Sequence, residues 1–238
     1  MLDKIIYRTG QTAIGLYADA MLKLDVVRHA PLPPGPKIIA VNHPTTTDPV
    51  LMMAIVPEPM SILITEMCFK VPAVGQYLRL AGHIPVMDGH GRAAFEEARR
   101  SLAAGRTVGI FPEGALSPLD GGVRHPHTGA VRLALSSGAP IIPVGIHLQR
   151  ERIRFVETTM DGKTDMARWY LRGPYAVTIG EPMVCAGDVE DREVVRALSE
   201  RMMQRITHLA RESALRLHSL PALGRGTSTR PVRVTGAS

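Results

Sequence analysis

Short apolar runs alternate with segments of helical periodicity along most of the chain, and this alternation constrains the fold more than any other feature. The strand-like runs cover residues 37–42, 61–65, 82–86, 106–111, 140–147 and 175–180, and the helical patterns cover 48–56, 91–104, 128–137 and 190–217. Gly105 and Gly138 stand where two of the helices should end. The alternation predicts an α/β fold in which a largely parallel mixed sheet is flanked by helices. The 238 residues suffice for one such domain, or two at most.

The stretch from Asn42 to Asp48 (Asn-His-Pro-Thr-Thr-Thr-Asp) directly follows the first strand-like run. It places the His43 imidazole five positions before the Asp48 carboxylate. A carboxylate that accepts from one ring nitrogen leaves the other nitrogen free to take a proton from an alcohol or from water. If Asp48 begins a helix, the turn brings the two side chains together. A strand-end histidine before a helix-capping aspartate is also common in α/β proteins, so this pattern alone leaves a structural role open.

A second polar stretch, from Phe111 to Ser117 (Phe-Pro-Glu-Gly-Ala-Leu-Ser), follows another strand-like run. Its Glu113–Gly114 pair puts a carboxylate and a flexible backbone at the carboxyl end of a strand, where ligands of α/β sheets usually bind. The two stretches together favour an active site over two ordinary turns. Ser117 lacks the Gly-x-Ser-x-Gly context of a nucleophilic serine, which argues against a covalent serine mechanism.

In these residues the chain resembles the glycerolipid acyltransferases of the lysophosphatidic acid acyltransferase (PlsC) type. Their signature is Asn-His-x4-Asp, followed some seventy residues later by Phe-Pro-Glu-Gly-Thr-Arg-Ser. Residues 69–86 and 139–146 resemble two further blocks of that family, and the resemblance spans roughly residues 35 to 185. Four blocks in the family's order are hard to obtain by chance.

The resemblance implies an O-acyltransferase that moves a fatty acyl group from acyl-CoA or acyl-carrier protein to a lysophospholipid hydroxyl, with 1-acylglycerol-3-phosphate as the first candidate acceptor. It implies that His43 is the general base, that Asp48 orients its ring, and that Glu113 and Gly114 help to bind the acceptor. The acceptor alcohol can attack the thioester directly, so the chemistry needs no cofactor and no metal ion.

Two departures from the family pattern concern the acceptor. Leu116 stands where members with phosphate-bearing acceptors usually have arginine, and Asp88 stands where the second block commonly has another. Arginine binds phosphate with two hydrogen bonds, whereas leucine has no donor for such a bond and aspartate repels the phosphate charge. Arg92, Arg124 and Arg132 lie within or beside the blocks as replacements, and we predict acceptor contacts for Arg92 and Arg124. Three alternatives remain open. The arginines are ordinary surface residues, the acceptor lacks a phosphomonoester, or the chain is an acyl-ester hydrolase that uses the same His–Asp pair.

Apolar residues at the N-terminus recur at helical spacing and predict an amphipathic helix. They are Leu2, Ile5, Ile6, Thr9, Ala13, Leu16, Tyr17, Ala20, Met21 and Leu24. Such a helix can lie on a lipid surface or pack against the domain. Because the family acts on membrane lipids, we expect peripheral attachment at the cytoplasmic face of the cell membrane. No run approaches the ~18 apolar residues of a spanning helix.

The formal net charge of +6 is compatible with an anionic lipid surface. No basic stripe with interleaved aromatics is visible, so we do not expect nucleic-acid binding. His125 and His127 are expected to be surface residues rather than metal ligands.

The expected organisation has three parts. Residues 1–30 form the N-terminal helix and the start of a linker, residues 31–217 form the acyltransferase domain, and residues 218–238 form a disordered tail. Pro31–Pro36 is interpreted as a stiff linker. Residues 147–173 interrupt the strand pattern and contain the single tryptophan, for which both a membrane-interface position and packing over the sheet edge remain open.

Overall fold

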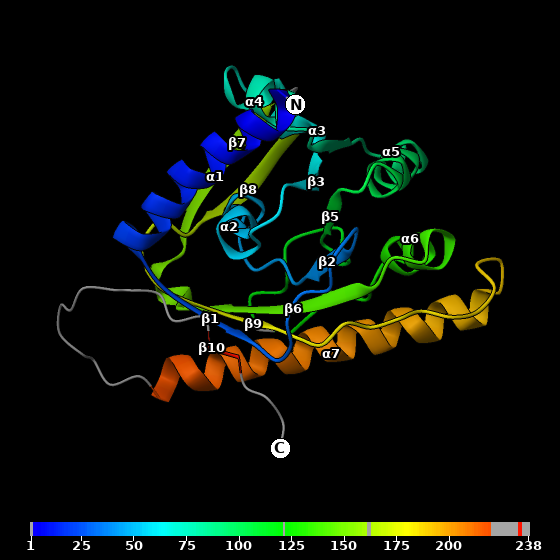
Figure 1. Ribbon diagram of the computed structural model, residues 1–238. Coiled ribbons are helices and arrows are strands. Elements are labelled where there is room, and N and C mark those ends of the chain that lie inside the picture. The colour runs from blue at the N-terminus through cyan, green and yellow to red at the C-terminus, as the bar shows by residue number, and fades with distance from the viewer. Residues whose placement is uncertain (1, 121, 161–162, 220–232, 235–238) are drawn as a thin grey trace.

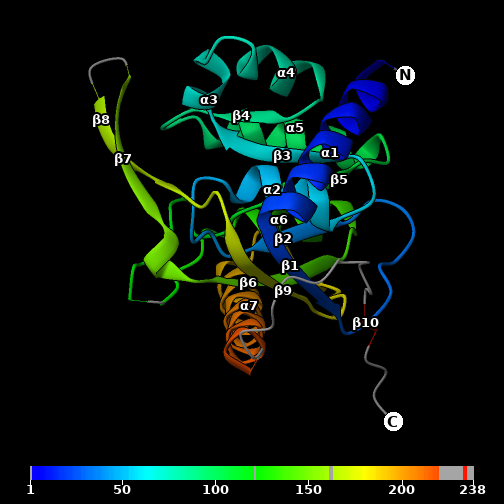
Figure 2. The same cartoon turned by 90° about the vertical axis from the view of Figure 1, so that its left-hand side faces the viewer.

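A computed structural model describes residues 2–120, 122–160, 163–219 and 233–234. One large sheet forms its centre, with helices on both faces (Figures 1 and 2). Its strand order is β10-β1-β9-β6-β2-β5-β3-β4, and described neighbours pair in parallel except β6 and β9. The strands are β1 (Leu22–Arg28), β2 (Ile38–Val41), β3 (Met60–Thr65), β4 (Ile84–Val86), β5 (Thr107–Ile110), β6 (Ile141–Leu148), β9 (Gly173–Ile179) and β10 (Arg233–Val234). The predicted α/β class with a largely parallel mixed sheet is confirmed.

The helices divide between the two faces of the sheet. Helices α1 and α2 cover one face, with α3 and α4 beside them, and α5, α6 and α7 cover the other (Figure 1). The helices are α1 (Leu2–Met21), α2 (Asp48–Ile55), α3 (Glu66–Lys70), α4 (Val74–Leu80), α5 (Gly91–Ala103), α6 (Gly129–Ser137) and α7 (Arg192–Ser219), with a short 3-10 turn η1 (Arg150–Arg152). In the described part of the chain, every helix falls short of the length and apolar character needed to cross a bilayer.

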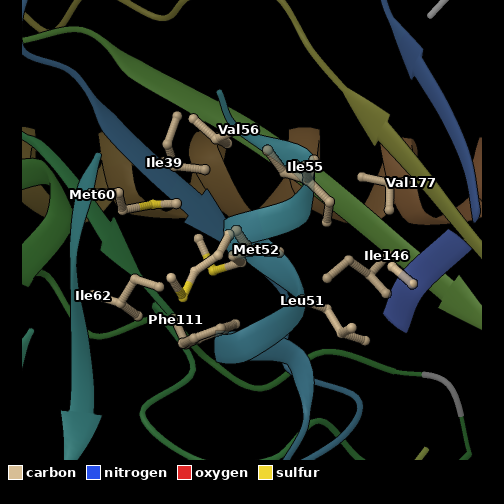
Figure 3. Close-up of a cluster of buried hydrophobic side chains, with 14 of the residues drawn as sticks. Ile39, Leu51, Met52, Ile55, Val56, Met60, Ile62, Phe111, Ile146 and Val177 are labelled. Atoms are coloured by element: carbon tan, nitrogen blue, oxygen red, sulfur yellow. The ribbon is translucent and has the colours of Figure 1, made fainter. Parts of the chain in front are cut away.

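Strand β2 shows why the central strands have continuous apolar sequences. All four of its residues are buried, because helices cover both faces of the sheet. Ile39 lies in the cluster that contains Met52 and Ile55 of α2 (Figure 3). Val41 belongs to the same cluster. The alternate residues of β2 face the cluster of α5, α6 and α7. The strand that leads into the Asn-His stretch is therefore held from both sides.

The N-terminal region differs from the prediction in one respect. The helical stripe was expected to run through Leu24, but α1 ends at Met21 and residues 22–28 form β1, which pairs with β9 along its whole length. Burial of Leu22 and Val27 against the sheet favours the extended conformation. Pro31–Pro36 consequently connects two strands of the same sheet, not a separate helix to a domain.

Residues 147–173 contain a second, two-stranded sheet that the sequence did not predict. Strands β7 (Arg154–Met160) and β8 (Lys163–Trp169) pair in antiparallel fashion and form an arm that extends away from the central sheet (Figure 2). Most of its side chains are exposed, so burial imposes no alternation of apolar and polar residues. Most of the predicted tail lies outside the described residues, and Arg233–Val234 form β10 beside β1.

Candidate active site

The two polar stretches meet at the carboxyl edge of the sheet. Strands β2 and β5 are parallel neighbours, with Ile38 opposite Val108, so the loops that follow them leave the sheet side by side. The backbone N–H of Ser117 donates to the carbonyl oxygen of His43 across 2.7 Å. Upstream, the Asn42 side chain exchanges two hydrogen bonds with the backbone of Ile146 at 3.0 and 2.7 Å. The loop that carries His43 is thus fastened to β6 on one side and to the Phe-Pro-Glu-Gly loop on the other.

His43 and Asp48 form the predicted pair. Their Nδ1 and Oδ2 atoms are 3.1 Å apart, and since a carboxylate only accepts, the ring proton between them belongs to Nδ1. Asp48 is the first residue of α2, where the helix dipole favours a negative charge. The His43 ring stacks on Phe111 with centroids 4.1 Å apart. Nε2 has no partner among the described residues, and the side chain is 16% exposed, so this nitrogen can accept a proton from a bound molecule.

Three further hydrogen bonds fix the Asp48 carboxylate. The Thr45 backbone N–H donates to Oδ2 at 2.7 Å, and the Thr45 and Tyr175 hydroxyls donate to Oδ1 at 2.6 and 2.8 Å. Burial, and then the neighbouring carboxylate, raise the pKa of Tyr175 well above its ordinary value, so its hydroxyl keeps its proton and donates. Sequence reasoning did not identify Thr45 or Tyr175. Tyr175 lies in β9, 127 positions after Asp48, and no local pattern marks it.

Glu113 is buried and points into the protein. Its Oε1 accepts from the His43 backbone N–H at 3.0 Å and from the Ser117 hydroxyl at 2.5 Å, and its Oε2 accepts from the Arg124 backbone N–H at 2.9 Å. This geometry gives Glu113 a positioning role that joins the two loops, while contact with the acceptor stays a prediction. The Ser117 hydroxyl is buried and occupied by this bond, which argues further against a serine nucleophile.

Gly114 makes the tight turn after Glu113 possible. Its φ angle is +65°, in the left-handed region, and a Cβ atom there would lie 2.6 Å from the His127 ring. The His127 backbone N–H in turn donates to the Pro112 carbonyl oxygen at 2.7 Å. Both the backbone conformation and the close ring require glycine here. Its predicted role in acceptor binding stays a prediction.

The structure places the three candidate arginines in different environments. Arg124 lies beside the site, and its Nε donates to the Leu116 carbonyl oxygen at 3.0 Å. Arg92 is exposed in the first turn of α5 and has no hydrogen bond or ion pair with the described residues of the two loops. Arg132 donates to the Val189 carbonyl oxygen, just before α7. Within the described residues, no group of three or more histidine, cysteine, aspartate or glutamate side chains is placed to hold a metal ion.

Sequence reasoning did not single out Arg168 of β8. Its guanidinium donates to the Ser117 carbonyl oxygen at 2.5 Å, and its backbone exchanges two hydrogen bonds of 2.9 Å with Thr46. The base of the β7–β8 arm therefore holds the loop between His43 and Asp48. This contact depends on a hairpin whose sequence carries no alternating pattern, so the sequence offered no signal for it.

We expect Glu113→Gln to lower the free energy of unfolding by about 1–3 kcal/mol, the usual cost of an unsatisfied buried polar group. The carboxylate accepts hydrogen bonds from the backbone N–H groups of His43 and Arg124. In the variant, the amide NH₂ must face at least one of these two donors. Urea denaturation followed by circular dichroism measures the change. Glu157→Gln, at an exposed position of the β7–β8 arm, is the matched control and should change stability by less than about 0.5 kcal/mol. Equal stability of both variants would contradict the positioning role.

Two proteins are similar to this chain in sequence, and one solved structure is similar to it in fold. A 1-acyl-sn-glycerol-3-phosphate acyltransferase from Borreliella burgdorferi is 32% identical over 113 residues, covering 46% of this chain and 45% of the relative. An uncharacterized protein from Mycobacterium leprae, ML2427, is 33% identical over 93 residues, covering 37% of this chain and 23% of the relative. The matches thus span less than half the length of these relatives. The crystal structure of the 1-acyl-sn-glycerophosphate acyltransferase PlsC from Thermotoga maritima superposes with a TM-score of 0.61 at 24% identity, over 88% of this chain and 78% of that one, and shows that the fold is shared.

Fold and site together define an α/β protein with a carboxylate-oriented histidine at the carboxyl edge of its sheet. The sequence model of the Acyltransferase family matches residues 23–147, just over half of the chain, and includes both site loops. This chain belongs to that acyltransferase family.

Proposed function

We propose that this chain is an O-acyltransferase that moves a fatty acyl group from a thioester to the hydroxyl of a lysophospholipid. The observation that carries the proposal is the His43–Asp48 pair, with Nδ1 held by the carboxylate at 3.1 Å and Nε2 without a described partner. Removal of a hydroxyl proton requires a base with one free, correctly oriented nitrogen. Family membership supplies the reaction class for which this base is used.

The pair supports direct transfer without a covalent enzyme intermediate. Nε2 of His43 removes the proton of the acceptor hydroxyl while the hydroxyl oxygen attacks the thioester carbonyl carbon. The Asp48 carboxylate stabilises the imidazolium that forms. The tetrahedral intermediate then expels the thiolate, which takes the proton back from His43 and leaves as the thiol. The products are the ester and the free thiol, and the His43 imidazole is neutral again.

We further propose 1-acyl-sn-glycerol-3-phosphate as the acceptor and acyl-CoA or acyl-carrier protein as the donor. The name of the Borreliella relative supports this acceptor. A panel of acceptors tests it: lysophosphatidic acid, the corresponding monoacylglycerol and lysophosphatidylcholine, each offered with labelled acyl-CoA and then with acyl-carrier protein. The proposal requires the highest kcat/KM for lysophosphatidic acid. Preference for an acceptor without a phosphomonoester would instead indicate that Leu116 selects a different acceptor.

A membrane surface is the proposed partner of α1. The helix packs on the domain through Tyr7 and Ala18, which are fully buried, and through Gln11, whose amide donates to the carbonyl oxygens of Met53 and Val56. The predicted apolar stripe lies largely on the other side. Ile5, Leu16, Tyr17 and Met21 are exposed by 57%, 67%, 37% and 44%. The helix therefore docks on the domain and still presents apolar side chains that suit a lipid interface.

We expect the double variant Ile5→Asp/Leu16→Asp to bind vesicles containing phosphatidylglycerol about 10–100-fold more weakly, because it loses two apolar side chains of about 1.5–3 kcal/mol each on full burial and adds negative charge. Vesicle sedimentation measures the partition coefficient. Point substitutions are preferable to deletion of residues 1–28, which would remove β1 from the sheet. The control Ser136→Asp/Gln204→Asp adds the same charge at exposed positions of α6 and α7. Equal binding by both double variants would move membrane attachment away from α1.

A further inference from the structure

A pocket lies beside the site loops, on the side of β6 and α7. Its volume is about 170 Å³. Arg150, Arg168 and Arg211 line it together with His147, and none of the described lining residues carries a carboxylate. Pro44, directly after His43, and Ser117 form the wall that it shares with the candidate active site. The rest of the lining is mainly apolar, from Leu119, Val123, Ile146, Leu148, Ile153, Ala210 and Ala214. A pocket of this composition suits an anionic group attached to a carbon skeleton.

One loop holds two of the three arginines that line this pocket, Arg150 and Arg168, and also holds Arg124 next to the lining residue Val123. Nε of Arg124 donates to the carbonyl oxygen of Leu116 at 3.0 Å, Arg168 donates to that of Ser117 at 2.5 Å, and Arg150 donates to that of Leu119. Each described side-chain bond uses one of the five N–H donors of a guanidinium. Donors therefore remain for a ligand on Arg150 and Arg168, whose side chains these bonds already orient.

Electrostatics at this place favours an incoming anion. Burial lowers the pKa of Arg168, and repulsion from Arg124 and then Arg150 lowers it further, while Asp165 acts in the opposite direction. Like charges gathered in a partly dry site repel one another until an anion neutralises them. Phosphate is the anion whose geometry best matches several guanidinium groups.

We propose that this pocket, through Arg150, Arg168 and Arg211, binds a phosphate group of one of the two substrates. The inference rests on the proposed acyl transfer for the identity of those substrates: the phosphate belongs to the lysophospholipid acceptor or to coenzyme A. All three arginines lie outside residues 23–147, the part that matches the family model. They supply a cationic site in a chain that has leucine at position 116 and aspartate at position 88.

Direct binding tests the pocket apart from catalysis. Titration calorimetry would compare a short-chain, soluble lysophosphatidic acid with its monoacylglycerol, and coenzyme A with pantetheine, on the full chain. Arg168→Gln and Arg211→Gln remove one cation each. Arg211 has no hydrogen bond to the loop among the described residues, so its variant tests the charge without disturbing Ser117. Arg196→Gln, exposed in the same helix α7, is the matched control.

We expect Arg168→Gln and Arg211→Gln each to weaken binding of one phosphate-bearing ligand at least tenfold, and Arg196→Gln to change it less than twofold. An effect on lysophosphatidic acid assigns the pocket to the acceptor, and an effect on coenzyme A assigns it to the donor. Unchanged affinities, equal losses in the control, or no preference for the phosphate-bearing member of either pair would overturn the proposal. A wild-type protein that binds in this way but transfers no acyl group would contradict only the proposed function.

Discussion

Replacement of His43 by alanine is expected to lower the rate of acyl transfer by about 10²–10⁴-fold, the usual contribution of a positioned general base. The substitution removes Nε2, the nitrogen that we assign to the hydroxyl proton, and leaves the acceptor without a base. The fold should survive, because the bonds that hold this loop use the backbone of His43. Its N–H donates to Glu113 and Ser117, and its carbonyl oxygen accepts from Ser117.

Initial rates with labelled acyl-CoA measure this effect, and far-ultraviolet circular dichroism checks the fold. His125→Ala is the matched control, since it removes an exposed imidazole from the loop that follows the Phe-Pro-Glu-Gly turn. A His43→Ala protein that keeps a substantial part of the wild-type rate would exclude His43 as the general base.

Replacement of Asp48 by asparagine should cause the second largest loss, about 10–100-fold, from one charge-assisted hydrogen bond of about 1.5–3 kcal/mol. The Thr45 backbone N–H donates to Oδ2 at 2.7 Å, so the amide oxygen of asparagine must take that position and the NH₂ group must take the place of Oδ1. The bond to His43 Nδ1 therefore persists only as a bond to a neutral oxygen, and the charge that strengthened it and stabilised the imidazolium is lost. We expect a smaller effect than that of His43→Ala for this reason.

The double variant His43→Ala/Asp48→Asn separates this role from a general loss of structure. If Asp48 acts through His43, the double variant is no slower than His43→Ala alone. If the rate reductions of the two single variants multiply in the double variant, the pair does not act as a unit. An Asp48→Asn protein with the wild-type rate and pH–rate profile would show the same.

The parts of the site that could be predicted from the sequence are those that depend on near neighbours along the chain. His43 and Asp48 lie five positions apart around the start of one helix, and both site loops follow buried, continuously apolar strands. Parallel pairing of β2 and β5 then brings Glu113 to His43. The positions of the two loops follow from strand and helix patterns, whereas the pairing of β2 with β5, which are separated in sequence by β3 and β4, is seen only in the structure.

Other contacts depend on packing that no local pattern encodes. Tyr175 reaches Asp48 from β9, and Arg168 reaches Ser117 from an exposed hairpin. The inward orientation of the Glu113 carboxylate depends on three donors, the most distant of which, the backbone N–H of His43, precedes it by 70 positions. At the N-terminus, the periodicity identified a helix, but Tyr7 and Ala18 pack on the domain and much of the apolar stripe remains exposed. A stripe marks an amphipathic helix without showing which side meets the protein.

The most direct test of this account follows the fate of a labelled acyl group from acyl-CoA, with and without lysophosphatidic acid, in the wild-type protein. Direct acyl transfer predicts labelled phosphatidic acid that forms only when the acceptor is added, with little free fatty acid in either reaction. Release of free fatty acid at the same rate without acceptor would contradict it, because the His43–Asp48 pair would then activate water and the protein would be a hydrolase.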